Sequence, residues 1–566
     1  MPAPASLRPT SLPTAPPPAP PEAEQAPAAV APEVSEAAAE ASAAATPAET
    51  LAPAAPWADG WLRAAALLPS LLALALYLRT AAPTITWRNG GDDSGDLVVA
   101  AATLGIPHPT GYPTYVVLGH LATWLPFGEV AYRLSLLSAL SAALAVSLVG
   151  ALVYLLARRS VGAPPALALL GALAGALAFG TSQLFWSQAA IPEVYALHLG
   201  FVSAIVFALV VWRAWGGERW LVAAAALLGL GLGNHVTLAL LLPAALPLVL
   251  DRPAPWRDGA LRRRVALAFA AGLAIYLYLP WRGAQFPPLL WGEPHHPAGL
   301  LAHVTGALYQ RYLFLGAPGD ALSRAAHVAT LLVEQIGWPG FVLGVVGAWW
   351  LWQSDRRLAV AGLVIVVGSA FFAVNYYARD SEVYLLPLFA AWAVALGVGA
   401  PALARVAGEA LRVERRWRVR LGLALAVAAL LATALQVPQT YARVDASADL
   451  TARDFARDVL AALPPRAVLL SDSDAHTFSL WYAQDVLGLR PDVAIVDLRL
   501  VAWPWYRAGL ERRHAGLALR SATTAAVVLD LLAAGPQGRP VYASGRLEAV
   551  ASNLGASGPP YTVRAP

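Results

Sequence analysis

Long apolar segments alternate with short polar joints between residue 61 and about residue 438. A run of about 20 apolar residues is long enough for a helix to cross the hydrocarbon core of a bilayer. The stretch 220–250 is longer, but Gly-Leu-Gly-Leu-Gly-Asn-His at 229–235 interrupts it, so we count two segments there. We therefore expect about eleven transmembrane helices, near residues 62–80, 131–157, 163–180, 195–213, 220–232, 236–250, 265–281, 338–353, 358–377, 383–405 and 421–438.

The polar joints between these segments differ in arginine content. The arginine-rich joints all fall on one side of the predicted membrane, at 158–159, 213–219, 252–264, 356–357 and 412–420. Cytoplasmic loops of membrane proteins carry an excess of Lys and Arg. We therefore place these joints and the N-terminus in the cytoplasm, and the C-terminus on the outer face of the plasma (inner) membrane.

Two flanking regions differ from the transmembrane part at 61–438. Residues 1–60 are rich in Ala, Pro and Glu with almost no large apolar side chains, so we expect a disordered tail. Residues 439–566 instead predict strands at 467–471, 492–497 and 540–543 and a helix at 475–486. Strand, helix and strand at this spacing are typical of a small α/β domain with a parallel sheet, which we place on the extracytoplasmic face.

The composition supports a membrane protein and excludes some chemistry. Of the 566 residues, 58% are hydrophobic and 13% are charged, whereas soluble domains carry about 25% charged residues. The chain has no cysteine, which excludes disulfides, thiol catalysis and thiolate metal ligands. All 39 basic residues are arginine. With the abundant Ala, Gly and Pro, we interpret this as GC-rich coding and expect no nucleic-acid partner.

An acidic cluster follows the first apolar segment. Asp92, Asp93 and Asp96 lie within five residues, and carboxylates this close to a membrane span are costly enough to indicate function. They could supply a general base, or bind a divalent ion such as Mg²⁺ or Mn²⁺ through their oxygens. Alternatively, Asp93 or Ser94 caps a helix that begins near Gly95.

Further polar and aromatic residues fall on the same predicted side of the membrane. A stiff loop at 105–113, rich in Pro and Gly, carries His108 and Tyr112. The other outer candidates are Glu193, Asn234, His235, Arg282, Trp291 and Arg311. Each has a structural alternative, such as helix capping for the glutamate or a membrane-edge position for the tryptophan. Together they indicate a polar cavity that faces outward and is accessible from the lipid.

Two runs of the sequence carry a resemblance to a known family: Gly-Gly-Asp-Asp-Ser-Gly-Asp-Leu at 90–97 and Leu-Gly-Ile-Pro-His-Pro-Thr-Gly-Tyr-Pro at 104–113. They resemble a large, mostly bacterial membrane family whose animal relative is a protein O-mannosyltransferase. The sequence departs from the family pattern by an extra Asp, by Asp96 where Glu is usual, and by Thr110 where Pro is usual. The likeness covers all but about the first 60 residues and continues at 193–198, 234–235, 278–282, 291–294 and 474–493.

The resemblance implies a glycosyltransferase of the GT-C class, with an α-helical polytopic membrane fold. Such enzymes use polyprenyl-phosphate sugars on the outer membrane face. The resemblance does not reveal the sugar or the acceptor. We expect mannose, with another hexose or a pentose as alternatives. We expect the acceptor to be a Ser or Thr hydroxyl of a secreted or membrane protein, with a lipid or a polysaccharide as the alternative. The resemblance implies no metal, because mannosyl relatives in this fold work without one.

The resemblance helps to choose the base, and the remaining roles are our hypothesis for the mechanism. Alignment on Ser94-Gly95 favours Asp93 as the general base, with Asp96 or Asp92 as the alternatives. Glu193 would orient the acceptor or the base. The proposed donors to the phosphate are Arg282, Arg311 and His108, and the other substrate-binding candidates are Tyr112, Asn234, His235 and Trp291.

A transporter or lipid flippase is the main alternative function. It would share the many spans and the broken helix, but we find no inverted repeats, and an external α/β domain fits transport poorly. A catalytically inactive scaffold is a third interpretation. The shorter side chain of Asp96 could misplace a base by about 1 Å, enough to slow a reaction about 100-fold.

Overall fold

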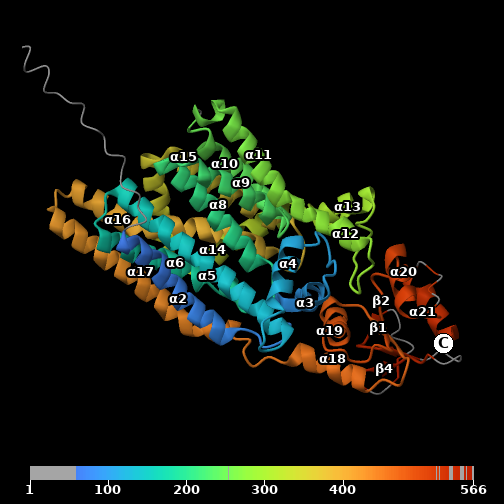
Figure 1. Cartoon of the computed structure of the whole chain (residues 1–566). Helices are drawn as coiled ribbons and strands as arrows, with labels where there is room; N and C mark the ends of the chain where they lie inside the picture. The colour runs from blue at the N-terminus through green and yellow to red at the C-terminus, as the bar shows by residue number, and fades with distance from the viewer. Residues whose placement is uncertain are drawn as a thin grey trace, which may run out of the picture. The chain divides into compact units, whose positions relative to one another are not determined.

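The computed structural model of the protein describes residues 59–563, except 253, 518, 520, 522, 535–538, 549–553 and 556–557. The predicted disordered tail at 1–60 lies outside the described residues but for its last two positions. The described chain is mainly helical, with a small sheet near its C-terminal end (Figure 1). This architecture confirms the predicted α-helical membrane fold with a small C-terminal α/β part.

The predicted transmembrane segments all coincide with helices, although the segment expected from 338 begins much earlier. The helices of this part are α2 (Gly60–Thr80), α3 (Ser94–Thr103), α4 (Pro113–Ala122), α5 (Val130–Leu156), α6 (Pro165–Gly180), α7 (Gln183–Ala189), α8 (Tyr195–Trp215), α9 (Glu218–Leu232), α10 (Leu241–Val249), α11 (Gly259–Leu273), α12 (Tyr278–Gly283), α13 (Pro297–Val304), α14 (Pro318–Ser354), α15 (Arg356–Asn375), α16 (Leu386–Ala410) and α17 (Arg415–Val444). Short helical turns join them, namely η2 (Arg88–Asp93), η3 (Ala157–Val161), η4 (Val236–Leu240), η5 (Ala254–Arg257), η6 (Ala274–Leu277), η7 (Gln310–Tyr312) and η8 (Ser381–Leu385).

Eight segments within the described residues are long and apolar enough to cross a bilayer. The pair α6 and α7, which is bent by 70°, would make a ninth if it counts as one span. The predicted segments at 220–232 and 236–250 are the shorter helices α9 and α10, with a break at 233–235 before η4. The break confirms the predicted interruption, while the total of eleven transmembrane helices stays a prediction.

Helices α5 and α16 lie at the centre of the bundle. Helix α5 packs against α2, α6 and α8, and α16 packs against α6, α14 and α17. Large aromatic side chains between these helices are fully buried, among them Tyr77, Tyr154, Phe179, Trp212 and Phe389. Leucines on the outer faces stay exposed, such as Leu71 at 58% and Leu435 at 81%. Exposed leucines on apolar helices are suited to contact with lipid tails.

The C-terminal part begins where α17 ends at Val444, beyond the predicted boundary at 438. Its sheet has the order β2-β1-β3-β4, in which β1 pairs in parallel with β2 and β3, and β4 is antiparallel to β3. The predicted strands, helix and parallel pairing are therefore confirmed. The elements are α18 (Thr451–Ala461), β1 (Val468–Ser471), α19 (Asp474–Asp485), β2 (Ala494–Asp497), α20 (Pro504–Arg513), α21 (Thr524–Ala534), β3 (Val541–Ala543) and β4 (Tyr561–Thr562).

Helix α19 of the C-terminal part packs directly on α3 of the membrane part (Figure 1). The indole Nε1 of Trp87 donates hydrogen bonds to the Ala475 carbonyl at 2.9 Å and to Ser479 Oγ at 3.0 Å. Gly95 allows the close approach, because a Cβ atom there would lie 2.3 Å from the carbonyl oxygen of Phe478. The acidic cluster at the start of α3 therefore lies against the C-terminal part.

Candidate active site

The carboxylate of Asp93 is not used to cap helix α3. Asp93 occupies the N-cap position, but its side chain accepts no hydrogen bond from the helix. The buried hydroxyl of Ser94 likewise has no hydrogen-bond partner among the described residues. The capping alternative is therefore wrong for both residues. The Asp93 side chain keeps 37% of its surface accessible, so its carboxylate is available to a ligand.

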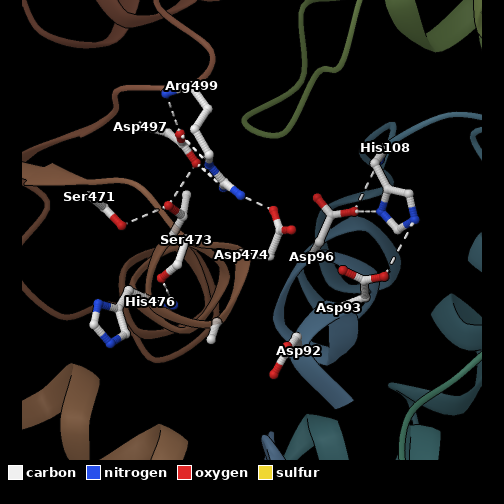
Figure 2. A network of polar contacts seen from close by, with 12 residues as sticks. Asp92, Asp93, Asp96, His108, Ser471, Ser473, Asp474, His476, Asp497 and Arg499 are labelled. Atoms are coloured by element: carbon white, nitrogen blue, oxygen red, sulfur yellow. Dashed lines mark hydrogen bonds and ion pairs between the residues drawn. The ribbon is translucent and has the colours of Figure 1, made fainter. Parts of the chain in front are cut away.

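Asp96, one turn further along α3, is completely buried. Its Oδ2 accepts hydrogen bonds from the backbone N–H of His108 at 3.0 Å and from His108 Nδ1 at 2.7 Å. Its Oδ1 accepts a hydrogen bond from the indole Nε1 of Trp291 at 2.9 Å. Figure 2 shows the pair of Asp96 and His108 beside Asp93. Asp96 thus holds the imidazole in place and does not face a substrate.

His108 connects the two aspartates. Its Nε2 lies 3.1 Å from the hydroxyl of Tyr112 and 3.9 Å from Oδ2 of Asp93. Its ring is parallel to that of Phe478 from the C-terminal part, with the centroids 6.5 Å apart. Burial lowers the pKa of His108, but the charge of Asp93 and the hydrogen bond with Asp96 outweigh it and raise the pKa to about 9. The ring is therefore an imidazolium at neutral pH.

The neighbourhood of Asp93 is strongly acidic. Desolvation raises the pKa of Asp93 above its ordinary value, and the charges of Asp474, Asp380 and Asp96 raise it further, while His108 opposes this shift. Burial also raises the pKa of Asp92, whose Oδ2 lies 3.6 Å from Nη1 of the exposed Arg379. A carboxylate whose pKa moves toward neutrality is better suited to accept a proton at physiological pH.

Glu193, Asn234 and His235 meet on the other side of the 105–113 loop. The Glu193 Oε2 accepts a hydrogen bond from the Val194 N–H at 2.9 Å, and burial raises the pKa of this glutamate well above its usual range. Asn234 donates from Nδ2 to the Val194 carbonyl at 3.1 Å. The ring of His235 stacks on Tyr112 at 5.9 Å. These residues thus form a buried group next to the pair of Asp96 and His108.

The two predicted phosphate-binding arginines lie elsewhere. Arg282 donates from Nε to the Leu104 carbonyl at 2.7 Å and from Nη2 to the Thr103 carbonyl at 3.2 Å. These are the unsatisfied carbonyls at the C-terminal end of α3, so this arginine serves as a helix cap. Arg311 is exposed, and its Nη2 donates to the Tyr312 hydroxyl at 3.0 Å. Within the described chain, neither arginine pairs with the acidic cluster.

The acidic cluster does not provide a suitable set of metal ligands. No group of three or more His, Asp or Glu side chains among the described residues is arranged to hold a metal ion. The oxygens of Asp96 are occupied by N–H donors, Asp93 faces an imidazolium, and Asp92 faces Arg379. These contacts do not favour a Mg²⁺ or Mn²⁺ ion at this cluster, which stays a prediction from the sequence.

The candidate residues predicted from the sequence do not include those supplied by the C-terminal part. Asp474 lies just beyond the carboxyl end of β1, where its Oδ1 is 2.9 Å from Nη2 of Arg499. The same guanidinium pairs with the buried Asp497 at the end of β2. Figure 2 shows this network beside the segment that carries Asp92, Asp93 and Asp96. The signal was present in the sequence, since polar residues after parallel strands collect at one edge of a sheet.

Comparison with known proteins relates this site to a family. Residues 93–255 match the family described as Protein O-mannosyl-transferase TMEM260 N-terminal domain, and residues 452–517 match TMEM260-associated domain 2. The Mus musculus protein named Protein O-mannosyl-transferase TMEM260 is 29% identical over 496 residues, which cover 82% of this chain and 67% of the mouse protein. The Dictyostelium discoideum protein of that name is 24% identical over 485 residues, which cover 76% of this chain and 57% of the relative.

Two solved structures resemble the chain at low sequence identity. ArnT from Cupriavidus metallidurans, bound to undecaprenyl phosphate, shares 16% identity at a TM-score of 0.49, covering 79% of this chain and 91% of ArnT. The oligosaccharyltransferase of Archaeoglobus fulgidus, in complex with Zn and sulfate, shares 16% identity at a TM-score of 0.46, covering 75% and 61%. The assignment to a family rests on the sequence matches.

The structure is a multi-pass helical bundle, and Asp96 and His108 form a buried acid–histidine group at one end of its helices. Taken with the sequence matches, these features define a membrane glycosyltransferase. The chain is related to the protein O-mannosyl-transferases of the TMEM260 family. The resemblance inferred from the motifs at 90–97 and 104–113 is thereby confirmed. The sugar, the lipid carrier and the acceptor are not fixed by this relationship.

Proposed function

We propose that the protein transfers a mannosyl residue from a polyprenyl-phosphate donor to a Ser or Thr hydroxyl of a secreted or membrane protein. The reaction takes place on the extracytoplasmic face of the plasma membrane. The observation that carries this proposal is the free carboxylate of Asp93, 3.9 Å from an imidazolium that is itself fixed by Asp96. The names of the two relatives support the choice of sugar and acceptor.

Asp93 is the general base in this proposal. Its carboxylate takes the proton from the acceptor hydroxyl, and the hydroxyl oxygen forms a bond to the anomeric carbon of the sugar. The bond between that carbon and the phosphate oxygen breaks, and its electron pair leaves with the polyprenyl phosphate. Positive charge develops on the sugar ring in the transition state, and the nearby carboxylate of Asp474 favours it electrostatically.

His108 has two roles that are compatible with this step. Its positive charge favours the ionised form of Asp93, which is the form that accepts a proton. Its Nε2–H group can also donate to an oxygen of the departing phosphate. Asp96 and Trp291 do not touch the substrate in this scheme; they are positioning residues that hold the imidazole. Arg282 has no role at the phosphate, because its guanidinium caps α3.

An apolar cavity supports a lipid-linked donor. It has a volume of about 250 Å³ and lies among α5, α8, α10, α14, α15 and α16, with almost entirely apolar and aromatic walls. It shares Val202 and Leu241 with a smaller recess that Tyr195 and His198 line. Tyr195 and His198 contact His235, whose ring stacks on the loop of His108. If the isoprenoid tail of the donor occupies this cavity, the phosphate at the end of the tail would lie on the side of the acid–histidine group.

The test compares membranes containing the wild type, Asp93→Asn or Asp92→Asn, each supplied with radiolabelled polyprenyl-phosphate mannose. Label should enter the protein fraction with the wild type and with Asp92→Asn, but not with Asp93→Asn at equal expression. Label that enters only lipid or glycan would overturn the protein acceptor. An active Asp93→Asn enzyme would overturn the base, and no transfer by the wild type from any sugar donor would leave a transporter or scaffold.

A further inference from the structure

A second pocket lies at the end of the bundle opposite the candidate active site. It has a volume of about 220 Å³ and is bounded by the π-helical turn η3, the start of α6, the end of α16 and the start of α17. Helix α16 begins beside Tyr384, which contacts His235 near the active site, and extends for 25 residues to the pocket. At 1.5 Å per residue, the two sites are roughly 35 Å apart.

Three arginines and one glutamate provide the charges of this pocket. Arg405 donates to the Val161 carbonyl at 2.8 Å and to Glu409 Oε1 at 3.0 Å. Arg418 reaches the same carboxylate with Nη1 at 3.6 Å, while its buried Nε has no hydrogen-bond partner within the described chain. Arg415 also lines the pocket, and its side chain has no partner among the described residues. One carboxylate cannot neutralise three guanidinium groups, so the pocket carries excess positive charge.

The helix ends around the pocket add to this positive potential. Helices α6 and α17 both begin there, and neither N-terminus is capped by a side-chain hydrogen bond. The first N–H groups of a helix and its dipole favour an anion at that end. Helix α17 has no acidic residue in its first turn and instead begins with Arg415. The N-cap residue Glu414 supplies a carboxylate at this end, but that carboxylate pairs with Nε of Arg416 at 2.6 Å.

We propose that this pocket binds a phosphate group, supplied by the head group of an anionic phospholipid or by free phosphate. Guanidinium groups bind phosphate oxygens through paired N–H donors. The arginine-rich joints fit the cytoplasmic face, where basic pockets between transmembrane helices bind lipid head groups. A tryptophan lies beside the pocket, because the guanidinium of the pocket residue Arg405 is 5.2 Å from the Trp350 ring. Tryptophan at a membrane interface favours the lipid as the source.

The experiment uses the purified full-length protein in a zwitterionic detergent, titrated with phosphatidylglycerol, phosphatidylcholine or inorganic phosphate. Binding is followed by native mass spectrometry and by the thermal unfolding midpoint. The variants are Arg415→Gln and the double variant with Arg418→Gln. Arg420→Gln is the matched control, since this exposed arginine lies on the same helix outside the pocket. Arg415→Gln keeps the design informative if the double variant does not fold.

We expect saturable binding of phosphatidylglycerol by the wild type, and no comparable binding of phosphatidylcholine. A loss of about 1 kcal/mol per arginine near a charged lipid predicts a roughly fivefold weaker affinity for Arg415→Gln and roughly 25-fold for the double variant. Equal weakening by Arg420→Gln would overturn the pocket in favour of general charge attraction. Inorganic phosphate that displaces the lipid at an equal concentration would support a phosphate-binding site. The same result would overturn the lipid head group as the source of the bound phosphate.

Discussion

Replacing Asp96 with Asn should uncouple His108 from helix α3 while leaving the side-chain volume unchanged. In the wild type, the two carboxylate oxygens accept three hydrogen bonds, two from His108 and one from Trp291. An amide has one acceptor oxygen and an NH₂ group that can only donate. At least one of the three buried donors must therefore lose its partner.

The structure sets the size of the expected effect. A buried donor without a partner costs about 1–3 kcal/mol of the free energy of unfolding. The raised pKa of His108 adds a second effect, because a shift from 6.5 to about 9 corresponds to about 3 kcal/mol of stability. Since the folded state binds this proton more tightly, the contribution is complete below pH 6.5 and is lost as the pH rises through 9. Without the hydrogen bond and the charge of Asp96, this pH dependence should become smaller, while the charge of Asp93 retains part of it.

The assay is the thermal unfolding midpoint in detergent at pH 6 and pH 9.5. The wild type should be clearly less stable at pH 9.5, whereas Asp96→Asn should be less stable at pH 6 and show a smaller difference between the two pH values. Asp497→Asn is the control, because this carboxylate is equally buried but contacts Arg499 and not His108. The reasoning is refuted if Asp96→Asn unfolds with the pH dependence of the wild type.

Three further predictions concern the same region. Asp93→Asn should lower the initial rate of sugar transfer by about 10²–10⁴-fold at an unchanged unfolding midpoint, and a rate within tenfold of the wild type would contradict the assigned base. Gly95→Ala should lower the unfolding midpoint by an amount equivalent to about 1–3 kcal/mol, because the added Cβ would meet Phe478. Gly368→Ala is the control and should leave the midpoint unchanged, because the space around Gly368 is open. Trp291→Phe keeps an aromatic ring but replaces the indole with a smaller phenyl group that has no donor for the buried carboxylate. We expect about 1.5–3 kcal/mol of destabilisation, measured by the same unfolding assay, and no change would show that this hydrogen bond is dispensable.

The membrane part could be predicted from the sequence because the bilayer imposes a simple length requirement on apolar helices. The strands at 467–471 and 492–497 were also predictable, since both are short apolar runs bounded by polar residues. The docking of α19 on α3 was not, because no local pattern reports it: Trp87 and Ala475, which are hydrogen bonded, are 388 residues apart. Local chemistry predicts elements, but such long-range contacts depend on the whole fold.

The candidate site shows the same division between local and long-range information. The motif around Asp93 indicated an acidic site, and the structure places the Asp93 carboxylate 3.9 Å from Nε2 of His108. The same motif could not distinguish Asp93 from Asp96, because only tertiary contacts reveal that Asp96 is occupied by Trp291 and by the imidazole. The contacts of Arg282 could not be predicted for a related reason. Its partners are carbonyls exposed where α3 ends at Leu104 in a left-handed conformation, a detail that composition and spacing do not contain.

The contact between α3 and α19 also has a consequence for how the enzyme is made. Helix α3 leaves the ribosome well before α19, because most of the membrane part lies between them in the chain. Domains generally fold in the order of synthesis, so Asp93 and His108 can insert with the membrane part before Phe478, which contacts the His108 ring, has been translated. A chain that terminates before α19 therefore lacks one wall of the candidate site.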